Sequence, residues 1–126
     1  MAYIVSSKTQ LLGALKSADM NVTTDQAIGI NASKYILRRI VVTDASLNLT
    51  TAAGGVYTAA SKAGTAVVGA AQVYTALTAA TKFVDCTLDA SCGTDYFTAA
   101  TLYLSLTTGQ GAAATANVYI YGDPLV

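Results

Sequence analysis

The longest run of large apolar and β-branched residues in the chain is 34–43 (KYILRRIVVT), which contains neither glycine nor proline. A run of this composition predicts a central β-strand. Strict alternation of side chains places Arg38 on one face with Ile36, Ile40 and Val42, and Arg39 on the other with Tyr35, Leu37 and Val41. Both faces are then mostly apolar, so we expect one to be covered by the protein's own core and the other by a further surface.

Seven shorter segments show the alternation or the β-rich composition that predicts strands: 26–30, 47–49, 56–60, 65–68, 82–88, 101–107 and 116–121. The alanine-rich segment 70–80 predicts a short helix, and Ala53-Gly54-Gly55 predicts a break between strands. No alternation of strands with long helices is present. The pattern therefore predicts an all-β fold, an antiparallel β-sandwich of jelly-roll type with about eight strands and at most one short helix. Its expected core is Ile36, Ile40, Val84, Leu88, Leu102, Leu104, Leu106, Val118 and Ile120.

The length of 126 residues is typical of one domain. We expect residues 1–24 to form an N-terminal arm that packs on a neighbouring subunit, or a loosely packed segment, and residues 25–126 to form the β-sandwich domain. The first residues lack the pattern of a secretory signal, and no apolar run reaches the roughly 18 residues that a membrane span needs. We therefore expect synthesis in a cytoplasm and no membrane association.

The composition argues against most catalytic and nucleic-acid functions. The net charge is zero, only 11% of the residues are charged, and the chain has no histidine. Without histidine the commonest general base and metal ligand is missing, and without a cluster of Lys and Arg nothing tracks a phosphate backbone. We expect no enzyme activity, cofactor, metal site or nucleic-acid partner. A surface with so little charge favours contact between protein molecules, because copies repel one another weakly.

Two groups of polar residues have plain structural interpretations. We expect Cys86 and Cys92 to be free thiols rather than a disulfide in a reducing compartment. Asp85, Asp89 and Asp95 lie close in sequence, but their spacing matches no calcium loop, so we interpret them as turn aspartates. One of the aspartates, Asp85 or Asp44, is expected to pair with an arginine of the central strand.

Three tyrosines of the last strands face away from the expected core. Tyr103, Tyr119 and Tyr121 alternate with the leucines of 101–107 and with Val118 and Ile120. Three interpretations are open for them: half-exposed strand residues without a special role, a platform that stacks sugars, or part of a subunit interface. We favour the subunit interface, formed by Arg38, Arg39, Tyr103, Tyr119 and Tyr121.

The segments 29–43 and 50–57, and later 101–107, 112–116 and 119–124, resemble small proteins encoded beside the structural genes of tailed bacteriophages. The resemblance extends over roughly residues 10–124. It implies a virion protein, most plausibly a capsid cement (decoration) protein with a jelly-roll or related fold. Such a protein forms a dimer or trimer on the capsid surface and stabilises the shell by bridging major capsid subunits, with residues 2–16 as an arm that reaches the capsid. The alternative is a structural protein of the neck, tail or head fibre with a glycan-binding surface.

Overall fold

The computed structural model describes residues 9–125. In this part of the chain the secondary structure consists of eight strands and one short 3₁₀ turn, η1. The strands are β1 (Gln10–Asp19), β2 (Gln26–Gly29), β3 (Tyr35–Thr43), β4 (Ala53–Ala59), β5 (Ala63–Val68), β6 (Phe83–Asp85), β7 (Thr101–Thr108) and β8 (Thr115–Pro124), and η1 is Ala90–Gly93.

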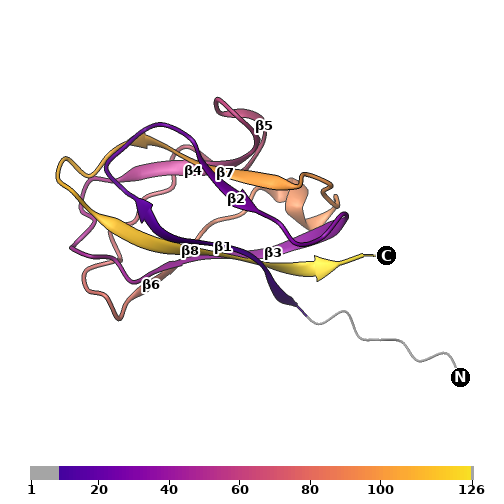
Figure 1. Ribbon diagram of the computed structural model, residues 1–126, viewed down its shortest axis with the longest axis horizontal. Helices are drawn as coiled ribbons and strands as arrows, with labels where there is room; N and C mark the ends of the chain where they lie inside the picture. The colour runs from indigo at the N-terminus through magenta and orange to yellow at the C-terminus, as the bar shows by residue number, and fades with distance from the viewer. Residues whose placement is uncertain (1–8, 126) are drawn as a thin grey trace, which may run out of the picture.

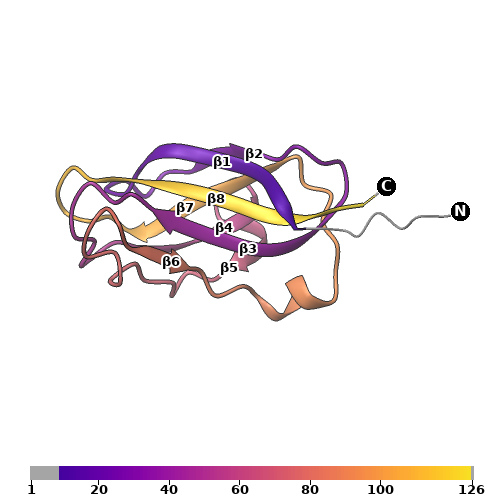
Figure 2. The same ribbon diagram turned by 90° about the horizontal axis from the view of Figure 1, so that it is seen from below.

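The strands form two antiparallel sheets of four strands each, packed as two layers (Figure 1). The first sheet has the order β1-β8-β3-β6 and is seen face-on in Figure 2, and the second has the order β2-β7-β4-β5. The all-β antiparallel prediction is confirmed. Across the two sheets β1 pairs with β8, β2 with β7, β3 with β6 and β4 with β5.

The core lies between the sheets and follows the alternation of the strands. Leu102, Leu104 and Leu106 of β7 are fully buried, as are Val118 and Ile120 of β8. Each such side chain contributes roughly 1.5–3 kcal/mol of hydrophobic free energy on burial. Two members of the predicted core, Ile36 and Leu88, are only partly buried. The core also contains large side chains that alternation did not single out: Met20, Tyr35, Leu37, Leu49, Tyr74 and Leu77.

A β-bulge interrupts the alternation of β3. The register against β8 shifts between Leu37, which pairs with Gly122, and Arg39, which pairs with Tyr121. Because a bulge adds one residue to a strand, the core face continues from Leu37 to Ile40 and both arginines remain exposed between them. The prediction that Arg38 shares a face with Ile40, and Arg39 with Leu37, is therefore wrong.

The expectation of an arm or loose segment over residues 1–24 is wrong for residues 10–20. β1 pairs with β8 from Gln10 to Asp19, and its Leu12 and Ala18 are buried together with the following Met20. This strand is an edge of the first sheet and part of the sandwich. Residues 1–8, which include most of the predicted capsid-reaching segment 2–16, lie outside the described residues.

Three further local predictions are wrong. The segment 70–80 contains turns and an isolated bridge from Val73 to Ala53 instead of a helix, and its Tyr74 and Leu77 fill the core. The segment 47–49 is not a strand. Ala53-Gly54-Gly55 belongs to β4 rather than to a break, because the glycines allow β4 to lie very close to neighbouring backbone: a Cβ on Gly54 would collide with Leu106 of β7.

We predict that Gly54→Ala destabilises the protein by about 2 kcal/mol or more, because Gly54 has φ +148° and its added methyl group meets β7 backbone. Gly69→Ala is the matched control, since a Cβ there has no neighbour within 4 Å, and should change stability by less than about 0.5 kcal/mol. Urea unfolding measures both. Equal stabilities of the two variants would contradict the close approach of β4 to β7.

Candidate functional site

The outer face of the first sheet is the surface that turns away from the core on β1, β8, β3 and β6. The strand register arranges its side chains in three rows. These rows are Leu11, Tyr121 and Arg39; Ala14, Tyr119, Val41 and Asp85; and Asn117, Thr43 and Phe83. Within residues 9–125, no strand or loop crosses the middle of this face (Figure 2). Phe83 is 60% exposed and Leu11 is 51% exposed, so the face offers large apolar side chains to a partner.

Tyr119 lies near the centre of this face and is held by polar neighbours. Lys16 Nζ donates a hydrogen bond of 2.7 Å to the Tyr119 hydroxyl and lies 4.8 Å from the centroid of its ring. Asn117 Nδ2 also contacts the hydroxyl, at 3.5 Å, and its Oδ1 accepts a bond from the Ser17 amide. The hydrogen bond to Tyr119 raises the pKa of Lys16 above its usual value. The tyrosine ring is thereby fixed in orientation, which lowers the entropy that a contact with a partner would cost.

Arg39 lies beside the aromatic residues on the same face. Its Nε donates to Asp85 Oδ2 at 3.2 Å, and both side chains are about half exposed. An ion pair this exposed contributes little to folding. Arg39, Val41, Thr43 and Asp44 form a hollow of about 530 Å³ with the residues before β6, Phe83 and Tyr121. The arrangement joins aromatic rings, a guanidinium group and carboxylates in one concave patch.

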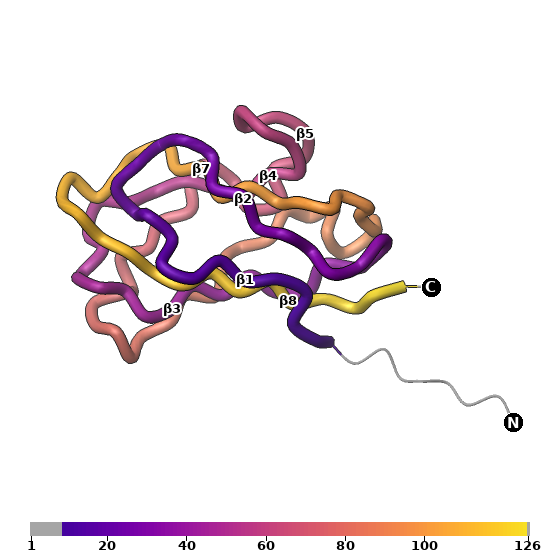
Figure 3. Tube along the Cα trace, viewed as in Figure 1, coloured from indigo at the N-terminus to yellow at the C-terminus, as the bar shows by residue number. Residues whose placement is uncertain are grey.

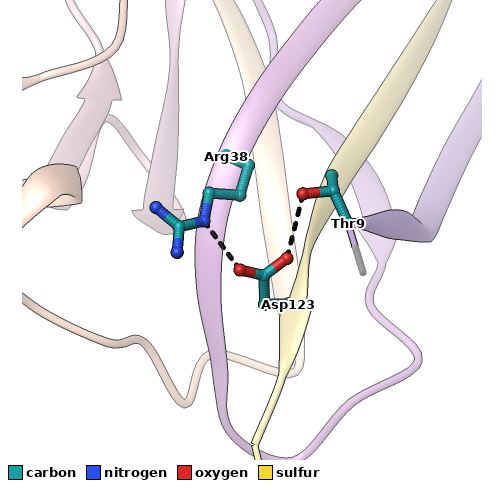
Figure 4. Close-up of polar contacts among 3 residues, drawn as sticks. All are labelled: Thr9, Arg38 and Asp123. Atoms are coloured by element: carbon teal, nitrogen blue, oxygen red, sulfur yellow. Dashed lines mark hydrogen bonds and ion pairs between the residues drawn. The ribbon is translucent and has the colours of Figure 1, made fainter. Parts of the chain in front are cut away.

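Arg38 has a different environment. Its Nε donates to Asp123 Oδ2 at 2.8 Å, and Thr9 Oγ1 donates to Asp123 Oδ1 at 3.0 Å (Figure 4). The Asp123 side chain is only 4% exposed, whereas that of Arg38 is 48% exposed. A buried carboxylate needs such partners, so Arg38 joins β3 to the end of β8 and to the residue before β1.

Tyr103 does not lie with the other two tyrosines. It points outward from β7 in the second sheet, where it pairs with Ala27 of β2 and Tyr57 of β4. The prediction of a single outward strip of Tyr103, Tyr119 and Tyr121 is therefore wrong: the three side chains belong to opposite outer faces of the sandwich. Arg39, Tyr119 and Tyr121 are brought together, and Tyr103 is separated from them.

The outer face of the second sheet is partly covered by the β4–β5 hairpin. Asp25, directly before β2, accepts hydrogen bonds from the Ser61 amide in the hairpin turn at 2.6 Å and from Ser105 Oγ of β7 at 2.8 Å. Since β7 lies between β2 and β4 in the sheet, the hairpin leans across β7 (Figure 3). Two register shifts within the hairpin allow this bend, and Gly64 in β5 has a positive φ of 70°. Outward-facing Ser105 is consequently fully buried.

The remaining polar candidates serve the fold. Cys86 and Cys92 are buried free thiols; burial raises the pKa of Cys86 to about 12 and also raises that of Cys92. Asp89 accepts hydrogen bonds from Ser91 at the start of η1, which lower its pKa. Over residues 9–125, no group of three or more His, Cys, Asp or Glu is placed to hold a metal ion.

The sequence alone did not single out four members of the candidate surface: Leu11, Val41, Phe83 and Asp85. Alternation within 82–88 places Phe83 on the face opposite that of Val84, so the sequence does indicate an exposed phenylalanine at this position. The described part of the chain contains no helix long and apolar enough to cross a membrane. Comparison of the chain with known protein families, characterised proteins and solved structures finds no match. The assignment of function therefore depends on the geometry of the surface.

We predict that replacing Arg38 destabilises the protein more than replacing Arg39 does. Arg38→Ala leaves the buried Asp123 with Thr9 alone and should cost about 1–3 kcal/mol. Arg39→Ala removes an exposed ion pair and should cost at most about 1 kcal/mol. Denaturant unfolding of both variants checks this, and a larger loss for Arg39→Ala would refute the assigned roles.

We predict an acid-sensitive contribution from Asp25. Its pKa is lowered, first by the hydrogen bond from the Ser61 amide, then by Ser105, and to a smaller extent by Lys62. A lowered pKa in the folded state means that the stabilisation is complete above the ordinary carboxyl value of 3.8 and is lost as the pH falls through the folded value. Thermal unfolding measured as a function of pH should show that stability falls more steeply in acid for the wild type than for Asp25→Asn. Asp95→Asn, which removes a carboxylate bonded only to neighbouring Thr94, serves as the control. Parallel wild-type and Asp25→Asn curves would argue against the Asp25 contact.

Proposed function

We propose that this protein is a capsid cement (decoration) protein of a tailed bacteriophage, which binds the major capsid protein as an oligomer whose copies meet through the outer face of the first sheet. The observation that carries the proposal is the contrast between the two outer faces. The hairpin crosses the second sheet, whereas the first sheet presents Leu11, Tyr119, Tyr121 and Phe83 with no covering element among residues 9–125.

The residue types of this face suit a protein partner. Tyr, Phe and Arg are enriched in the centre of protein interfaces, and aromatic residues dominate their energetics. The near absence of net charge on the chain means that copies approach one another without strong repulsion. The resemblance of segments such as 29–43 to small proteins encoded beside the structural genes of tailed bacteriophages is the ground for proposing a capsid subunit as the further partner. No chemistry beyond surface burial is required.

The mechanism we propose is mechanical reinforcement of the shell. A standard protein interface buries about 1,200–2,000 Å² in total, and an oligomer that contacts several capsid subunits adds the benefit of multivalency. Contacts that span subunit junctions oppose the separation of the capsid subunits under the internal pressure of packaged DNA.

A second candidate function is glycan binding by a head fibre, neck or tail protein. The observation in its favour is the hollow of about 530 Å³, which combines the rings of Phe83 and Tyr121 with Arg39 and Asp44. Aromatic rings stack on sugar faces, while charged side chains bond to sugar hydroxyls.

We predict that Phe83→Lys lowers the affinity for capsid shells by about tenfold or more, because the exposed ring would lie at the contact between copies and loss of the oligomer removes multivalent binding. Tyr96→Lys is the matched control, since Tyr96 is 56% exposed but lies next to η1 and outside the outer face of the first sheet. Co-sedimentation with shells of the phage that encodes the chain, assembled without it, measures both. Absence of the chain from purified virions would contradict the proposal. Unchanged shell binding together with lost binding on a glycan array would favour the second candidate.

A further inference from the structure

We propose that the outer face of the first sheet packs against the same face of a second copy, about a two-fold axis parallel to the strands and midway between β8 and β3. This inference deepens, and rests on, the proposed function, in which that face binds protein. It follows from the strand order β1-β8-β3-β6, which places two strands on either side of the proposed axis.

The register determines which residues meet. Rotation about an axis parallel to the strands places each row of side chains opposite the same row of the other copy. It also places β8 of one copy opposite β3 of the other, and β1 opposite β6. Tyr121 and Arg39 share one row, and Tyr119 and Val41 share the next. The rotation therefore lays Arg39 of each copy over Tyr121 of the other, and Val41 over Tyr119. A guanidinium group on a tyrosine ring is a favourable pair. Val41 is only 8% exposed, so the second pair adds little contact area.

The alternative axis, perpendicular to the strands, gives a poorer match. This rotation places each strand opposite the same strand of the other copy and reverses the order of the rows. Arg39 would then face Thr43 of the other copy, and Tyr121 would face its Asn117. The ring and the guanidinium group would then each lose its partner. The chemistry of the rows thus selects the axis that is parallel to the strands.

Charges on the face also suit a second copy. The face and the adjoining hollow carry the cations Lys16, Arg39 and Lys82 and the anions Asp44 and Asp85. Lys16 lies on the β1 edge and Asp85 on the β6 edge, and the rotation brings these two edges together. Lys82, directly before β6, lies at the same edge as Asp85, so that edge carries both signs, and Asp85 is the charge there that complements Lys16 of the other copy.

The size of the face is sufficient. Strands of 10, 10, 9 and 3 residues, about 4.8 Å apart and rising about 3.3 Å per residue, give a projected area on the order of 500 Å². Side-chain relief increases the accessible area, and a standard interface buries about 800 Å² on each partner. Two sheets from two copies would pack as aligned sheets do inside a β-sandwich, about 10 Å apart.

The test uses two cysteine variants, Ala14→Cys and Asp85→Cys, which lie in one row at opposite edges of the sheet. Within one chain these positions are three strand spacings apart, roughly 14 Å. The proposed axis instead places position 14 of one copy over position 85 of the other. A short bis-maleimide should therefore cross-link a mixture of the two variants into a dimer and leave each variant alone uncross-linked. The wild type, with Cys86 and Cys92 buried, controls for background.

Light scattering supplies the second readout. The wild type should have twice the 12.8 kDa mass of the chain, and Tyr121→Glu should halve that mass, whereas Ala27→Glu on the second sheet should leave it unchanged. A wild-type monomer, or cross-linking of Ala14→Cys to itself, would overturn the inference. Shell binding by a monomer would leave the proposed function standing without the dimer. A dimer of this geometry that does not bind shells would overturn the proposed function instead.

Discussion

The extra residue in β3 determines what each side of the first sheet presents. If β3 alternated strictly, either Leu37 or Ile40 would leave the core, and one arginine would be directed into it. The bulge keeps both apolar side chains inside and both guanidinium groups outside. It thereby avoids the cost of burying an unpaired charge in an apolar core. Arg38 is then free to bind Asp123, and Arg39 joins the aromatic row.

The two outer faces are used differently. Asp25 anchors the β4–β5 hairpin across β7, so the second sheet is partly closed by the chain itself. The first sheet has no such element among residues 9–125, although it carries the larger apolar side chains. Leaving Phe83 and Leu11 more than half exposed gives up burial free energy in the isolated chain, and a contact with a partner would recover it. This difference is the physical basis of the proposed interaction surface.

The fold class could be predicted from the sequence because the strands are short, separated by turn signals, and alternate strongly in 101–107 and 116–121. The bulge could not, because it depends on how β3 pairs with β8 rather than on the local composition of 34–43. The alanines of 70–80 favour a helix locally, but burial of Tyr74 and Leu77 beneath the sheets outweighs that weak preference. The strand at 10–19 contains Gly13 and lacks a β-branched run, so only its pairing with β8 reveals it. For the candidate site, alternation correctly turned three tyrosines outward, but it carries no information on which sheet each strand joins, and Tyr103 was misplaced for this reason.

The central claim is that a protein partner covers the outer face of the first sheet, and hydroxyl-radical footprinting of the tyrosines tests it most directly. Oxidation of Tyr119 and Tyr121 should fall several-fold when the protein is concentrated or bound to shells, because a partner excludes water from both rings. Tyr96, which is exposed elsewhere on the molecule, should be oxidised at the same rate in every sample. Equal oxidation of Tyr119 and Tyr121 in the dilute, concentrated and shell-bound protein would contradict the account.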